Sequence, residues 1–265
     1  MITIELKDFL KEIGDSVHSM NTIAVALSTM PNENPEIPDG LDISWKPQNL
    51  NRSKTISRNY AERSALVYAA ESLFQFLESI STNIFWKYPE INFNGKEKKA
   101  DKVYKFLTSI PTISKEMAIL AELLCHWRNK VVHAKASNAI LSSNKKDLLI
   151  SKRDDIYETF HHFDVSIALD NFTKNRITLK DVSTLITIVI KCARLVDEYY
   201  FDGIAELNDI NTYLSFFLMD SEFQLIYNQE HSNKKERQLN TWLNMHYPYI
   251  PINQRVVIKE NIIKK

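Results

Sequence analysis

The sequence predicts an all-α fold, and three observations support that prediction. Only four of the 265 residues are glycine, whereas sheets with tight hairpins and phosphate-binding loops both use glycine heavily. Apolar residues recur with a helical period in segment after segment. Prolines lie between those segments, where they do not interrupt a helix. We therefore expect a helical bundle with an N-terminal helix and a C-terminal helical extension.

Polar or proline-rich connections separate the expected helices. Prolines between residues 31 and 47 exclude a helix there, and Asp39-Gly40 is expected to form a turn. Ser114 is a good N-cap, and Thr178 with Asp181 resembles a capping box. Loops are expected at 89–95 and 142–146. The expected helices cover 4–29, 57–80, 96–109, 114–135, 153–170 and a segment from 178 to about Gly203; two more helices reach residue 246, and the tail, 247–265, is compatible with strand or helix.

Composition indicates a globular protein of the reducing cytoplasm. With 44% hydrophobic residues, a chain of this length can bury a stable core without disulfide cross-links. Its only cysteines, Cys125 and Cys192, are not spaced for a disulfide framework or a zinc site. The N-terminus does not resemble an export signal, and the longest apolar run falls far short of a membrane span. Cytoplasmic localisation without membrane association is therefore expected.

The charge balance argues against general nucleic-acid binding. The formal net charge is zero, whereas such proteins are usually strongly basic. Any nucleic acid would have to bind locally, and each basic stretch is most simply interpreted as a solvated face. Neither a Rossmann nor a P-loop glycine motif is present, so nucleotide sites of those kinds are not expected. The basic stretches are Arg52, Lys54, Arg58 and Arg63; Lys96, Lys98 and Lys99; Lys145 and Lys146; and Lys234, Lys235 and Arg237.

The segment with the clearest candidate catalytic residues lies near the end of the helix expected over 114–135. It is Arg128-Asn129-Lys130-Val131-Val132-His133. On a helical wheel, one stripe of this helix is apolar. The opposite stripe carries hydrogen-bonding and titratable groups and is expected to face away from the core. Arg128 lies about 140° from His133 around the helix axis, so a straight helix would not easily present both to one phosphate. The apolar stripe is Met117, Leu120, Leu124, Trp127 and Val131; the polar stripe is Glu122, His126, Asn129 and His133.

This arginine, polar residue and histidine on an amphipathic helix resemble the R-x4-6-H motif of the HEPN superfamily. The resemblance covers about residues 52–200. It implies a HEPN-like helical core over 51–203, preceded by an N-terminal helix and proline-rich connection over 1–50 and followed by the helical extension over 204–265. Arg128, Asn129 and His133 match the motif, whereas Glu122, His126 and Lys130 are possible neighbours of the site. Lys135 stands where a toxin subgroup paired with nucleotidyltransferase antitoxins carries tyrosine, so modification of that kind is not expected.

The resemblance implies a metal-independent endoribonuclease that works as a homodimer through the motif helix. Histidine can act as acid or base near neutral pH, and arginine can stabilise charge on phosphate. RNA would be cleaved by its own 2′-hydroxyl, leaving a 2′,3′-cyclic phosphate, without metal or cofactor. Toxin and phage-defence proteins are the usual settings of this family, so an inhibitory antitoxin is a possible partner.

Several alternatives are weaker. The second function class is a noncatalytic helical module that uses the polar stripe for dimerisation or partner binding. His161 and His162 would point to different sides of a helix, which disfavours a metal site. Cys125 and His126 are neighbours that would not face each other, which disfavours a cysteine nucleophile. The aromatic residues could stack on RNA bases, but core packing is the simpler interpretation; they are Phe74, Phe76, Trp127, Phe216 and Phe217.

Overall fold

The computed structural model is all-α, as predicted, and its described residues contain twelve helices and no strand. It describes residues 2–31, 37, 39–82, 86, 96–133, 140–205, 210–230, 232–248, 250 and 252–263. No helix within these ranges is both long enough and apolar enough to cross a membrane. The contacts divide the chain into two compact units.

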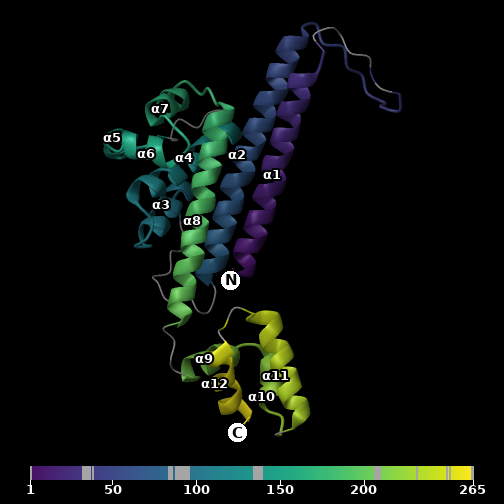
Figure 1. Ribbon diagram of the computed structural model, residues 1–265, viewed down its shortest axis with the longest axis vertical. Helices are drawn as coiled ribbons and strands as arrows, with labels where there is room; N and C mark the ends of the chain where they lie inside the picture. Colours follow the sequence, from purple (N-terminus) through teal and green to yellow (C-terminus); the bar gives the residue numbers. More distant parts are fainter. Residues whose placement is uncertain are drawn as a thin grey trace. The chain divides into compact units, whose positions relative to one another are not determined.

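The larger unit contains residues 5–79 and 91–196. Three long helices, α1 (Ile4–Thr29), α2 (Leu50–Thr82) and α8 (Leu179–Ala205), lie side by side in it (Figure 1). Phe9 of α1 packs against Phe76 of α2 with ring centroids 5.3 Å apart, and Ser72 donates a 2.6 Å hydrogen bond to Glu12. The N-terminal helix therefore belongs to the core of this unit, whereas the sequence suggested a separate segment over 1–50.

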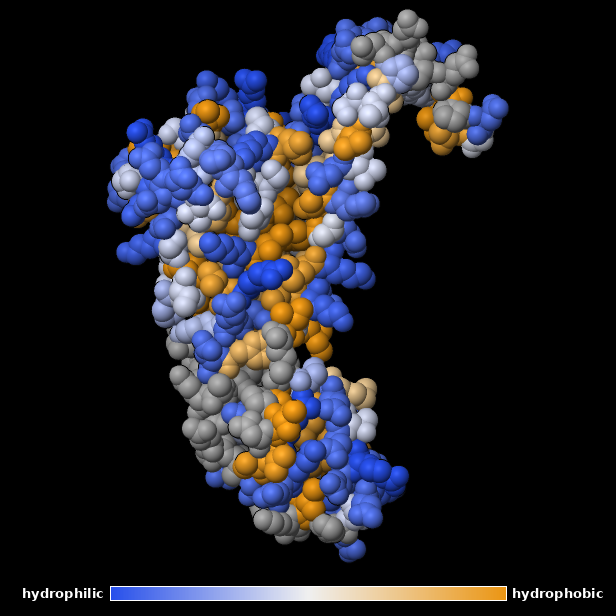
Figure 2. Space-filling view, viewed as in Figure 1, coloured by the Kyte–Doolittle hydropathy of each residue, from blue (hydrophilic) through white to orange (hydrophobic). Residues whose placement is uncertain are grey.

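Five shorter helices pack beside α2 and α8 (Figure 1). On the face seen in Figure 2, the residues of α5 to α7 are mostly hydrophilic, and hydrophobic residues gather over the long helices. The five shorter helices are α3 (Lys99–Thr108), α4 (Lys115–Val132), α5 (Ser143–Ser151), α6 (Arg153–Thr159) and α7 (Val165–Thr173). One of them, α4, carries the motif segment.

The smaller unit contains residues 1–4, 80–90 and 197–265. Its described core is aromatic: the rings of Phe217, Phe223 and Trp242 pack with centroids 4.8 to 5.2 Å apart. Three helices precede residue 247 where two were expected, and the tail is helical. The helices are α9 (Ile210–Phe217), α10 (Ser221–Tyr227), α11 (Asn233–His246) and α12 (Ile252–Ile263).

Local capping explains where several elements begin. Ser114 accepts a hydrogen bond from the backbone N–H of Met117, and Thr178 and Asp181 form the expected capping box. Gly40 has a φ of +89° in the expected turn. Helix α2 starts seven residues earlier than predicted, because Asn49 accepts from the N–H of Arg52 and caps it.

Two further expectations were wrong. The segment 142–146 is not a loop, since α5 begins at Ser143. The helix expected over 153–170 is two helices, α6 and α7, because the backbone turns at His161 and His162, whose φ values are +52° and +59°. Left-handed backbone of this kind cannot continue an α-helix. The loop expected at 89–95 lies outside the described residues.

Candidate functional site: the C-terminal end of α4

Helix α4 is buried on all sides over most of its length. Every residue from Met117 to Trp127 is buried, including both members of the polar stripe in this stretch, Glu122 and His126. Burial ends at Arg128, which with Asn129 and Lys130 is half-buried, and His133 is exposed. At its C-terminal end, α4 therefore reaches the surface through the motif segment.

Glu122 and His126 were expected to face away from the core, and this was wrong. Lys145 of α5 holds Glu122 with distances of 2.6 and 2.7 Å from its Nζ to the two carboxylate oxygens. His126 Nε2 lies 3.4 Å from the same carboxylate, and Lys145 also lies 3.6 Å above the ring of Tyr104. We call Glu122, His126, Lys145 and Tyr104 the buried polar cluster. It ties α4 to α3 and α5, so Glu122 and His126 have a structural place inside the protomer.

Lys130 also has a structural partner. Its Nζ donates to the backbone carbonyl of Phe172 in α7 and lies 3.8 Å from the centroid of that residue's ring. Burial, with a contribution from Lys146, lowers the pKa of Lys130. The ring of Phe172 meets Trp127 edge-on at 5.1 Å. Lys130 thus fixes the last turn of α4 against α7.

Arg128 is held in place by a carboxylate of α2. Its Nε lies 2.6 Å from Oε1 of Glu71, an ion-pair distance, although the N–H does not point at a hydrogen-bond acceptor. Its Nη1 donates to the side-chain oxygen of Asn129 at 3.2 Å. Nη2 has no hydrogen-bond partner among the described residues. The guanidinium is therefore oriented by two neighbours and keeps one nitrogen available.

Lys99 is the second cation on Glu71. Its Nζ lies 2.7 Å from Oε2 of that carboxylate. Burial raises the pKa of Glu71, but the hydrogen bond from Lys99 and the charge of Arg128 outweigh it, and the pKa falls below its ordinary value of 4.5. Glu71 is therefore ionised at neutral pH, and the two cations that it pairs with leave one positive charge among Arg128, Lys99 and Glu71 (2 − 1 = +1).

His133 is not part of the helix, contrary to the prediction of a helix up to about residue 135. It is the C-cap of α4, with φ −116° and ψ 98°, and its backbone N–H still donates to the carbonyl of Asn129 at 3.0 Å. Lys135 lies outside the described residues. The turn away from helical backbone means that the 140° separation from Arg128 does not apply. No hydrogen bond or ion pair joins the two side chains in the described part of the chain.

The other candidate groups lie elsewhere. His161 and His162 are both exposed in the connection between α6 and α7. Cys125 is buried, and burial, followed by the charge of Glu122, raises the pKa of its thiol to about 12. A thiol with such a pKa is not a nucleophile at neutral pH. Neither Glu71 nor Lys99 could be connected with Arg128 from the sequence, because both lie far from it along the chain, and Lys99 was interpreted only as part of a basic stretch.

Comparison with protein-family models, curated proteins and solved structures gives no significant match for this chain.

Proposed function

We propose that this protein is a metal-independent endoribonuclease whose active site lies at the C-terminal end of α4. The single observation behind the proposal is that Arg128, fixed by Glu71 and Asn129, and the exposed His133 occupy the end of an otherwise buried helix. A preoriented guanidinium with a free nitrogen suits a phosphate oxygen. An accessible imidazole suits proton transfer near pH 7.

The proposed reaction uses the 2′-hydroxyl of RNA as its nucleophile. A base removes the 2′-proton, the 2′-oxygen attacks the adjacent phosphorus, and the bond to the 5′-oxygen breaks as an acid protonates that oxygen. The products are a 2′,3′-cyclic phosphate and a 5′-hydroxyl. His133 is assigned to proton transfer and Arg128 to stabilising charge on phosphorus. Asn129 is assigned to orienting the guanidinium, since its side-chain oxygen accepts from Nη1.

A homodimer would supply both the acid and the base. Because Glu122 and His126 are buried within the protomer, the proposed contact between protomers is made by the exposed end of α4 and not by the whole polar stripe. We place the activity in the cytoplasm, as a toxin or phage-defence effector, and an inhibitory antitoxin would bind the same exposed end.

The test is cleavage of total RNA in buffer containing EDTA. We expect His133→Ala and Arg128→Ala each to reduce cleavage by about 100-fold or more. Matched controls are His18→Ala and Arg194→Ala, which remove an exposed histidine and an exposed arginine from α1 and α8. DNA of the same sequence should remain intact for want of a 2′-hydroxyl. Equal cleavage by wild type and His133→Ala would refute the assignment.

Mixing two inactive variants tests the dimer. If Arg128 of one protomer works with His133 of the other, a heterodimer of Arg128→Ala and His133→Ala regains one intact site. A mixture in equal amounts should then recover about a quarter of wild-type activity, since half of the dimers are mixed and each has one of two sites. If instead the two copies of His133 divide the acid and base roles, or if both groups act within one protomer, the mixture stays inactive. If the protein is instead a noncatalytic helical module, RNA should stay intact with wild type, with each variant and with the mixture.

A further inference from the structure

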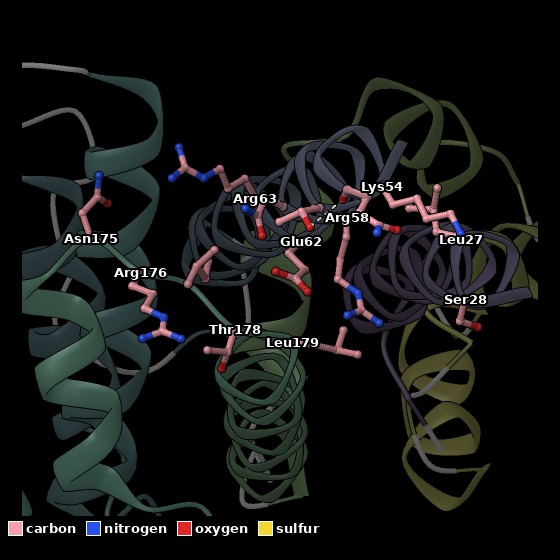
Figure 3. A pocket seen from close by; sticks show the side chains of 14 residues that line it. Leu27, Ser28, Lys54, Arg58, Glu62, Arg63, Asn175, Arg176, Thr178 and Leu179 are labelled. Carbon is pink, nitrogen blue, oxygen red and sulfur yellow. Dashed lines mark hydrogen bonds between the residues drawn. The ribbon is translucent and has the colours of Figure 1, made fainter. Parts of the chain in front are cut away.

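A basic pocket lies in the larger unit, at the end of the long helices where α1 finishes and α2 and α8 begin. Its volume is about 770 Å³, and it is lined by the end of α1, the first half of α2 and the connection from α7 to α8. Figure 3 shows cationic side chains reaching it from α2 and from that connection. Small-molecule sites typically have volumes of about 300–1,000 Å³. The pocket is thus large enough for a nucleotide.

Its lining carries more positive than negative charge. Lys54, Arg58, Arg63 and Arg176 face one lining carboxylate, Glu62, which leaves a formal excess of three positive charges (4 − 1 = +3). Lys54 donates to the backbone carbonyl of Met30 at 2.6 Å, so its position is fixed. A protein of zero net charge thus concentrates cations at one concave place, which is how a local anion site is built.

The three guanidinium groups are not held by a carboxylate in direct contact within the part of the chain that the structure describes. No side-chain hydrogen bond or ion pair of Arg58, Arg63 or Arg176 is formed with any residue that the structure describes. Arginines on an ordinary solvated face also lack partners, but these three line one pocket from two separate parts of the chain. Arg58 and Arg63 come from α2, and Arg176 from the connection before α8.

The single carboxylate of the lining, Glu62, is buried. Glu62 is only 3% exposed, and burial raises its pKa, with Arg58 lowering it and the charge of Asp181 raising it further. Asp181 is itself buried and occupied by hydrogen bonds from Asn171 and Thr178. In Figure 3, Glu62 lies between Arg58 and Arg176. Its hydroxyl form could donate to a phosphate oxygen, and its ionised form would oppose one.

We propose that this pocket binds the phosphate groups of a nucleotide-sized ligand, through Arg58, Arg63 and Arg176. Guanidinium groups bind phosphate oxygens bidentately, and three of them suit two or more adjacent phosphates. The same chemistry is offered by a free nucleotide and by successive nucleotide units of an RNA strand. The site stands independently of the nuclease assignment, because binding requires neither Arg128 nor His133.

The pocket is also near enough to the end of α4 for one strand to reach both. Arg63 precedes Glu71, the partner of Arg128, by eight residues on α2, which corresponds to roughly 12 Å along a helix. Arg176 follows Phe172, which anchors Lys130, by four residues. The source of the phosphates can therefore be decided only by comparing ligands.

The experiment measures binding of three probes in EDTA: ATP, inorganic tripolyphosphate and a short single-stranded RNA. The His133→Ala background keeps the RNA intact during the titration. The test variant is Arg58→Gln with Arg176→Gln, both exposed in the free protein. The matched control is Lys11→Gln with Arg194→Gln, which removes the same charge from exposed positions outside the pocket. Unchanged circular dichroism and melting temperature establish that each variant is folded.

We expect the test variant to weaken phosphate binding on the order of tenfold or more, because charged hydrogen bonds are lost. The control should stay within about twofold. The Glu62→Gln variant should bind more tightly above the pKa of Glu62, because a like charge is removed. For the RNA, the slope of log Kd against log salt should fall by about one to two in the test variant.

The pattern across probes identifies the source. Binding of ATP and tripolyphosphate indicates a free nucleotide, and binding of RNA alone indicates a strand; either result supports the site. The proposal is overturned if no probe binds wild type at about 1 mM, or if the test and control variants lose affinity equally. Absence of RNA cleavage by wild type, with phosphate binding retained, would contradict only the nuclease assignment.

Discussion

Replacing Lys145 with methionine should destabilise the larger unit strongly, because it would leave a buried carboxylate without its cation. The side chain of Glu122 is only 2% exposed, and that of Lys145 is 19% exposed. Methionine keeps most of the length of the lysine stem, so the change removes charge more than volume. The remaining polar neighbour of Glu122 is His126, at 3.4 Å.

The expected loss of stability follows from the ion pair between Lys145 and Glu122 in the folded state. Breaking a buried ion pair by removing one partner costs about 3–5 kcal/mol. Since Lys145 is partly exposed, water can reach the cavity left by its ammonium, and we take the lower limit of about 3 kcal/mol. The lost contact with the ring of Tyr104 adds on the order of 0.5 kcal/mol. At about 2–4 °C per kcal/mol for a domain of roughly 150–250 residues, a total of about 3.5 kcal/mol should lower the melting temperature by about 7–14 °C.

Urea unfolding, followed by circular dichroism and tryptophan fluorescence, measures the change. The control is Lys146→Met, the next residue in α5, which is half-buried and has no ion pair among the described residues; it should cost less than about 0.5 kcal/mol. A Glu122→Gln substitution combined with Lys145→Met should recover about 2 kcal/mol, since no buried charge is then left unpaired. A cost below about 1 kcal/mol for Lys145→Met, or strict additivity in the double variant, would refute the reasoning.

Two further predictions concern ionisable groups. The pKa of Glu71 is lower in the folded protein than in the unfolded chain. The ion pairs of Glu71 therefore stabilise the fold fully at pH values above its pKa in the unfolded chain. This stabilisation is lost as the pH falls through its lower pKa in the folded protein. Urea titrations of wild type and Glu71→Gln should therefore differ at pH 7 and converge below pH 4.5; a constant difference would contradict this. Burial raises the pKa values of Cys125 and Cys192 to about 12, so both thiols should react with an aromatic disulfide reagent only when urea unfolds the protein. Rapid reaction of the native protein would show that one of them is accessible.

Much of the fold could be predicted where a local signal marks an element. Helix α1 covers the predicted residues because Pro31 stops the apolar rhythm, and the cap at Ser114 and the capping box at Thr178 mark the starts of α4 and α8. The break at His161 and His162 could not be predicted, since neither glycine nor proline marks it. There the packing of α6 and α7 decides the backbone.

The site was predicted less completely, for a different reason. A helical wheel predicts that only one face of a helix is buried. Because α2, α3, α5 and α7 surround α4, the polar stripe is also buried, at Glu122 and His126. Such burial is possible only because Lys145 supplies a matching charge. That pairing depends on tertiary structure, which the periodicity of one helix does not contain. The same holds for Glu71, which meets Arg128 across two helices.

The abrupt change from interior to surface at Arg128 separates two kinds of mutational constraint along one helix. Upstream of it, any change of size or polarity disturbs close packing, so loss of function there would report misfolding. From Arg128 onward the side chains are half-buried or exposed, so a shortened side chain disturbs less packing, although Arg128 and Lys130 still hold this turn to α2 and α7. An inactive variant of His133, which is exposed and lies beyond the helix, can therefore be interpreted chemically, whereas a variant of Arg128 or Lys130 must first be shown to fold.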